Sequence, residues 1–177
     1  MTVFFTADTH FGHGGARGLY RRPFASTAEM DVAMLRAWNE TVGLLDEVWH
    51  LGDFAVGPTP DRTALLLEGL SGIKHLVTGN NDSAGTRALP GWSTVQDYAE
   101  LVIENTGLVL CHYAFRSWRN MQRGWLNLHG HSHGRLAPPM PRQFDVGVDC
   151  RGFRPVQLAD LQRRSPARAG AARRTGS

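Results

Sequence analysis

The stretch TVFFTADTHFGH, residues 2–13, places two chemically active side chains directly after a short apolar run. The run is rich in β-forming residues and predicts a buried strand over 2–7. Asp8 and His10 follow it, separated only by Thr9. Because residues i and i+2 of an extended backbone point to the same side, we expect Asp8 and His10 to converge on one point.

The same order of strand and polar residue recurs twice in the first half of the chain. EVWHLGD, residues 47–53, predicts a second strand that leads to Asp53. KHLVTGN, residues 74–80, predicts a third strand that leads to Asn80. Polar side chains are therefore expected at the carboxyl ends of three successive strands.

Two helices are predicted between these strands. Residues 26–43 have capping-box spacing at Ser26 and Glu29 and one apolar stripe, and residues 60–70 begin with Pro60. A β-α-β-α-β order is typical of a parallel sheet with helical crossovers. Ligands bind such sheets beyond the carboxyl ends of the strands, which is where the polar residues lie.

The second half of the chain has short strand-like segments with little helix between them. It predicts a second, largely antiparallel or mixed sheet, and PVQLADLQRR predicts a last helix over 155–164. We expect an α/β protein with two sheets packed face to face and helices outside. The strand-like segments are STVQDYAELVIE (93–104), GLVLCHY (107–113), GWLNLHGH (124–131) and QFDVGVDC (143–150).

The stretch LHGHSHG, residues 128–134, adds a histidine cluster, and His112 follows the apolar run LVLC. His131 and His133 again stand two residues apart, whereas His129 is interpreted as a supporting or structural residue. Carboxylates, an amide and imidazoles without thiolate disfavour structural zinc. Such a set suits two divalent ions that share a carboxylate, with manganese favoured and iron or zinc as alternatives.

In this order, the motifs DTHFGH, WHLGDF, LHGHSHG and DVGVD resemble the calcineurin-like metallophosphoesterases, most closely the small bacterial and phage members, over nearly the whole chain. The resemblance implies a four-layer αββα sandwich. It also implies a phosphoesterase in which a hydroxide bridging two ions attacks phosphorus. The implied ligands are Asp8, His10 and His133 for one ion and Asn80, His112 and His131 for the other, with Asp53 bridging.

The chain departs from the family pattern at GNND, residues 79–82, where the family usually has GNHD or GNHE. Asn81 replaces the histidine that, in the family, helps to protonate the leaving group. An amide cannot deliver a proton near neutral pH, although it can donate a hydrogen bond to a phosphoryl oxygen. Some family members that lack this histidine are biased toward phosphodiesters, so the resemblance implies that phosphodiesters are favoured. The alternatives are a phosphomonoesterase with another proton donor and a metal-stabilised binding module with little turnover.

Three further residues are candidates for the reaction. His13, in the same glycine-rich loop as His10, either replaces the missing histidine or fixes the loop. Asp82, which would orient that histidine in the family, here either bonds to Asn81 or caps the next segment. Arg116 is either a phosphate ligand or a surface arginine.

The composition, 42% hydrophobic in 177 residues, fits one domain, expected over 1–164. The five arginines from Arg163 onward exceed the net charge of +3, so the basic character belongs to an Arg-rich tail, expected to be disordered over 165–177. No apolar run is long enough to span a membrane, and the first residues do not resemble a signal peptide. We expect a cytoplasmic protein whose partner is a phosphate ester, such as a nucleotide or nucleic-acid end, and no membrane. The oligomeric state is not indicated.

Overall fold

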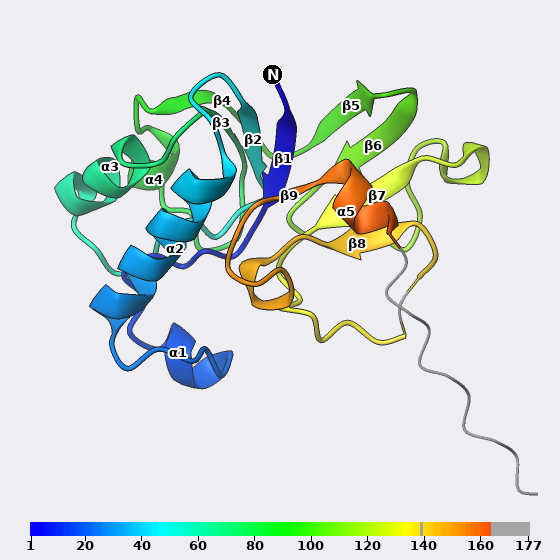
Figure 1. Ribbon diagram of the computed structural model, residues 1–177. Helices are drawn as coiled ribbons and strands as arrows, with labels where there is room; N and C mark the ends of the chain where they lie inside the picture. The colour runs from blue at the N-terminus through cyan, green and yellow to red at the C-terminus, as the bar shows by residue number, and fades with distance from the viewer. Residues whose placement is uncertain (139, 164–177) are drawn as a thin grey trace, which may run out of the picture.

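The computed structural model describes residues 1–138 and 140–163, and these residues form two mixed sheets packed face to face (Figure 1). The predicted α/β sandwich of two mixed sheets with flanking helices is confirmed. The expected Arg-rich tail over 165–177 lies outside the described residues.

The first sheet has the order β4-β3-β2-β1-β9, and every neighbouring pair is parallel except β1 and β9. The β-α-β-α-β prediction is therefore correct for the first half of the chain. The strands are β1 (Val3–Thr6), β2 (Glu47–His50), β3 (Ile73–Val77), β4 (Trp92–Gln96) and β9 (Val156–Gln157).

The second sheet has the order β5-β6-β7-β8, in which β5 and β6 are antiparallel and the remaining neighbours are parallel. Its inner face packs on the first sheet through side chains such as Leu108, Leu110 and Leu128, which meet Phe5 and Leu51. The strands are β5 (Ala99–Ile103), β6 (Thr106–Leu110), β7 (Leu126–His129) and β8 (Gln143–Asp145).

The other face of the first sheet is covered by helices (Figure 1). The longest, α2, begins as predicted at Ser26, whose hydroxyl accepts the Glu29 N–H at 3.0 Å. The Glu29 carboxylate accepts the Ala25 N–H, one residue before the position expected for a capping box. The helices on this face are α1 (Ala16–Leu19), α2 (Thr27–Thr41), α3 (Pro60–Glu68) and α4 (Ala84–Arg87). Helix α5 (Leu158–Gln162) instead packs its Leu158 and Leu161 with the core between the sheets.

Two sequence-based boundaries were wrong. The segment predicted as one strand over 93–104 is divided, because buried Trp92 anchors β4 to the helical side of the first sheet while Ala99 faces the core between the sheets. The helix predicted over 155–164 begins with a strand, because buried Val156 pairs with Phe5. None of the helices in the described ranges is both long and apolar enough to cross a membrane.

Candidate metal centre

Within the described residues, two groups of three side chains could each hold a metal ion. In each group, one ligand atom from every member lies within 4.8 Å of the others. Both groups lie beyond the carboxyl ends of the strands, where the sequence placed the polar residues. The first group is Asp8, His10 and His133, and the second group is Asp53, His112 and His131.

Asp53 lies between the two groups. Its Oδ2 is 3.5 Å from His10 Nε2 of the first group, and its Oδ1 is 3.6 Å from His112 Nε2 of the second group. Asn80 Oδ1 lies 3.1 Å from the same His112 nitrogen, which places Asn80 beside the second group. The structure thus brings all seven predicted ligands together, and Asp53 has the position expected of a shared carboxylate.

The ligand loops have a left-handed backbone, not the extended one expected from the spacing of the ligands. The φ angles are 57° at Asp8, 50° at His10, 60° at Asp53, 63° at His131 and 47° at His133. A left-handed conformation costs a non-glycine residue roughly 1–2 kcal/mol, so other interactions must hold it in place. The bond from the His131 N–H to Asp8 Oδ1, 3.0 Å, is one of them.

Two glycines allow the loops after β2 and β3 to meet. A Cβ atom at Gly52, where φ is +90°, would lie 2.6 Å from the Gly79 backbone and from His112 Nδ1. A Cβ atom at Gly79 would lie 2.3 Å from Asp53 Oδ1. Any side chain at either position would therefore displace a predicted ligand.

Hydrogen bonds fix the orientation of two ligand imidazoles. His112 Nδ1 lies 2.8 Å from the Leu51 carbonyl oxygen, so Nδ1 carries the proton and Nε2 faces the second group with its lone pair. His133 Nδ1 lies 2.7 Å from Asp149 Oδ2, which leaves Nε2 available in the same way. A partner of this kind is typical of histidines that bind metals.

Arg22, which the sequence analysis did not identify, connects Asp149 to the loop that carries Asp8 and His10. Its side chain is almost fully buried and forms a bidentate ion pair with Asp149, with N–O distances of 2.8 and 2.9 Å. It also donates to the carbonyl oxygens of Asp8 and Thr9 at 2.6 and 2.8 Å. Burial alone would raise the pKa of Asp149, but the hydrogen bonds from His133 and Arg22 outweigh it and lower the pKa.

Asp82 differs from its predicted catalytic role. The carboxylate is 3% exposed and accepts three backbone N–H groups, those of Asp53, Phe54 and Gly79, at 2.8–2.9 Å. It makes no hydrogen bond with the Asn81 side chain among the described contacts. Asp82 is a positioning residue that joins the loops after β2 and β3, because its oxygens are already occupied and lie out of reach of a substrate.

The remaining predicted residues have different surroundings. Asn81 is exposed at the edge of the second group and donates to both Asp53 oxygens, from its N–H at 2.8 Å and its amide at 2.6 Å. His13 is half-buried, with its Nδ1 3.3 Å from His10 Nδ1, and burial lowers its pKa. Arg116 is exposed and lines a separate cavity beside Phe115, and no described contact joins it to either group.

The electrostatics of the first group fit a bound cation. Asp8 Oδ2 and His10 Nε2 are buried, and neither has a hydrogen-bond partner among the described residues. Burial raises the pKa of Asp8 well above its ordinary value and lowers the pKa of His10 to about 3. A divalent ion would take both free lone pairs and compensate the buried carboxylate, so the residues present fit the implied metal.

Two tyrosines that the sequence did not identify flank the groups. The Tyr20 ring stacks on His133 with centroids 3.5 Å apart and an angle of 10° between the planes. The Tyr113 ring meets His131 edge to face at 4.8 Å. No pattern in the sequence distinguishes these rings from ordinary packing aromatics.

Known proteins resemble this chain over most of its length, although no protein-family model matches it. The gene 66 protein of Mycobacterium phage D29 is 32% identical, over 84% of this chain and 88% of its own. The uncharacterized protein MJ1445 of Methanocaldococcus jannaschii is 28% identical, over 88% and 86%.

Among solved structures, the protein of unknown function AQ665 from Aquifex aeolicus has a TM-score of 0.73 at 20% identity, over 90% of this chain and 96% of its own. An archaeal phosphodiesterase aligns with a TM-score of 0.48 at 16% identity, over 83% and 82%. The agreement with AQ665 concerns the fold. The chain belongs to the family of the gene 66 protein of Mycobacterium phage D29.

Proposed function

We propose that the protein is a metal-dependent phosphoesterase that favours phosphodiesters. The observation that carries the proposal is the position of Asp53, whose two carboxylate oxygens face His10 of one group and His112 of the other. Two nearby ions with open positions are suited to hydrolysing phosphate esters. A protein that only bound a partner would have no use for a second group of ligands around one shared carboxylate.

The ligand groups would hold the two ions, and manganese suits their mixture of carboxylate, imidazole and amide donors. When bound, such ions lower the pKa of a shared water and neutralise charge on the phosphoryl oxygens. The protein contributes orientation: Leu51 and Asp149 fix the imidazoles of His112 and His133, and Asp82 fixes the loop that carries Asp53.

The preference for diesters rests on Asn81. Asn81 is exposed, and its amide lies beside the shared Asp53; it can donate a hydrogen bond to a phosphoryl oxygen, but it cannot protonate a leaving group. Substrates whose leaving group departs without being protonated are therefore favoured. The alternative, a phosphomonoesterase, would need His13 as proton donor, and the contact of His13 with His10 keeps this alternative open to test.

The first test compares hydrolysis of bis(p-nitrophenyl) phosphate and p-nitrophenyl phosphate by protein stripped with a chelator and reloaded with manganese. We expect turnover that depends on manganese and a higher kcat/KM for the diester. The blank is Asp53→Asn, and Asn81→His should raise monoester hydrolysis relative to diester hydrolysis. A wild-type preference for the monoester would refute the diester proposal and direct attention to His13. Absence of turnover on both, with metal bound, would favour the binding module.

A further inference from the structure

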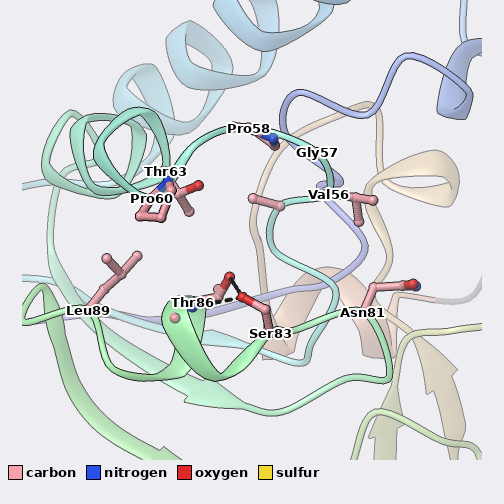
Figure 2. Close-up of a pocket in the computed structure, with 11 residues that line it drawn as sticks. Val56, Gly57, Pro58, Pro60, Thr63, Asn81, Ser83, Thr86 and Leu89 are labelled. Atoms are coloured by element: carbon pink, nitrogen blue, oxygen red, sulfur yellow. Dashed lines mark hydrogen bonds between the residues drawn. The ribbon is translucent and has the colours of Figure 1, made fainter.

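A cavity of about 220 Å³ extends from Asn81 between α3, α4 and the loop that follows β2. Figure 2 shows Asn81 at one end of this cavity and Leu89 at the other. Pro60 and Thr63 of α3 line one wall, and Thr86 of α4 faces them. The cavity thus begins at the side chain that donates to Asp53.

The lining is neutral and mostly apolar. None of the eleven described residues that line the cavity is charged. Three of them carry hydroxyl groups: those of Ser83 and Thr86 bond to each other at 3.1 Å, and that of Thr63 donates to the Thr59 carbonyl oxygen at 3.0 Å. Most of the lining is apolar, including Val56 and Leu89, and no side chain in it carries a charge, so a charged ligand would lose its hydration here without a countercharge.

The walls of the cavity are fixed by contacts with the first ligand loop. Pro58 packs against Gly12, where a Cβ atom would lie 2.2 Å from the proline Cγ. The Val56 N–H donates to the Phe11 carbonyl oxygen at 3.0 Å. The cavity is therefore preformed, and a ligand that enters it pays little ordering entropy.

We propose that this cavity binds one ester substituent of the substrate, and that the substituent is neutral, apolar and about the size of a single ring. The inference rests on the proposed phosphoesterase function, because it requires a phosphoryl group at the ligand groups. The cavity is smaller than the roughly 300–1,000 Å³ of pockets that enclose drug-sized ligands. Asn81 touches both places, so a phosphoryl group beside it has its substituent at the entrance of the cavity.

The test measures binding, not turnover, of two probes with the same anionic head. Phenylphosphonate and methylphosphonate are titrated by calorimetry into the manganese-loaded protein. Phenylphosphonate is expected to bind about tenfold more tightly, because its ring adds buried apolar area that the methyl group lacks.

Two variants fill the cavity from different walls. Leu89→Trp occupies the far end, and Gly85→Leu adds bulk on α4, where a Cβ atom meets only Ser83 Oγ at 3.6 Å. Either variant should reduce the tenfold preference to about one without changing the affinity for methylphosphonate. The matched control is Leu65→Trp on α3, because Leu65 is 61% exposed and does not line the cavity. Circular dichroism checks that each variant is folded.

The outcomes separate the two proposals. If neither phosphonate binds to the metal-loaded protein, the phosphoryl site and this inference both fail. If both bind with equal affinity, or if both folded cavity variants keep the preference for the phenyl group, the phosphoryl site stands and this inference is overturned. Loss of the preference in Leu65→Trp as well would also overturn it, because the effect would then not come from the cavity.

Discussion

The two ligand groups have the same kinds of side chain but differ in how the protein supports them. The first group contains the buried residues Asp8 and His10, and its third member, His133, is held by Asp149. In the second group His131 is exposed, and His112 is held by a backbone carbonyl group. The first group adjoins the buried ion pair of Arg22 and Asp149, whereas the second, in which Asp53 and His112 are also buried, has one exposed member.

This difference indicates that the groups have different roles. The ion pair of Arg22 and Asp149 supports both the first group and the fold, so loss of this ion pair would destabilise the protein. The second group contains the exposed His131, where a substrate can approach. We expect the first group to bind its ion more tightly and the second to exchange ion and substrate more readily.

The largest effect is expected from the residue that the two groups share. Asp53→Asn should reduce turnover on the order of a thousandfold and reduce metal binding in both groups, because each carboxylate oxygen faces a different group. Turnover assays and metal analysis after gel filtration measure the two effects. Asp61→Asn, an exposed acid on α3, is the control. Undiminished activity in Asp53→Asn would eliminate the two-ion arrangement.

The second prediction tests whether the first group is part of the fold. Asp149→Asn leaves the buried Arg22 without its carboxylate, which should lower the free energy of unfolding by about 3–5 kcal/mol. It should also weaken manganese binding at the first group by about 10–100-fold. Urea unfolding and calorimetry provide the measurements. His131→Ala should weaken manganese binding without a comparable loss of unfolding free energy. Equal losses of unfolding free energy in Asp149→Asn and His131→Ala would show that the first group is no more a part of the fold than the second.

A third prediction concerns pH and the core beneath the first group. His50 is buried with its Nε2 2.9 Å from the Thr9 hydroxyl, and burial lowers its pKa from 6.5 to about 3. Below pH 6.5 the unfolded chain binds a proton at His50 that the folded chain excludes. The free energy of unfolding therefore falls as the pH falls from 6.5 toward 3, by about 1.4 kcal/mol per pH unit.

The control for this pH effect is His50→Gln, which has no proton to gain. Urea unfolding of the metal-free proteins at pH 7 and pH 5.5 should show a steeper loss of stability for the wild type than for the variant. Equal slopes would mean that His50 is protonated in the folded protein and that this part of the core is accessible to water.

The smallest effects are expected from the two tyrosines. Tyr20→Leu removes a ring stacked on His133 and should weaken manganese binding at the first group by roughly threefold. Tyr113→Leu removes an exposed ring beside His131, and a smaller effect is expected at the second group. Calorimetry of both variants compares them directly. If Tyr113→Leu weakens manganese binding more than Tyr20→Leu does, the second group is the more strongly supported one.

Much of the fold could be predicted because local signals agreed with it. Ser26 marked the start of α2, and the apolar runs before Asp8 and Asp53 marked β1 and β2. The division between β4 and β5 could not be predicted, because both strands have similar composition and only the partners of Trp92 and Ala99 assign them to different sheets.

The predicted ligands came together because they follow the carboxyl ends of parallel strands in both sheets, but the backbone that achieves this was not predicted. Left-handed conformations at aspartate and histidine depend on long-range hydrogen bonds, such as that from the His131 N–H to Asp8. The spacing of the ligands along the sequence does not indicate them. Arg22 and Asp149 are separated by 127 residues, so no local pattern connects them. The hydrogen-bond partners of Asp82 were not predicted for the same reason, since they belong to two different loops.

The pairing of β9 with β1 has a consequence for how the protein is made. The strand that starts the first sheet receives its second neighbour only from Val156 and Gln157, close to the end of the described chain. The carboxylate that neutralises Arg22 is also contributed late, by Asp149. During synthesis, the first ligand group therefore stays incomplete until the last part of the domain has left the ribosome. We therefore expect metal to bind this group only after Asp149 has been synthesised.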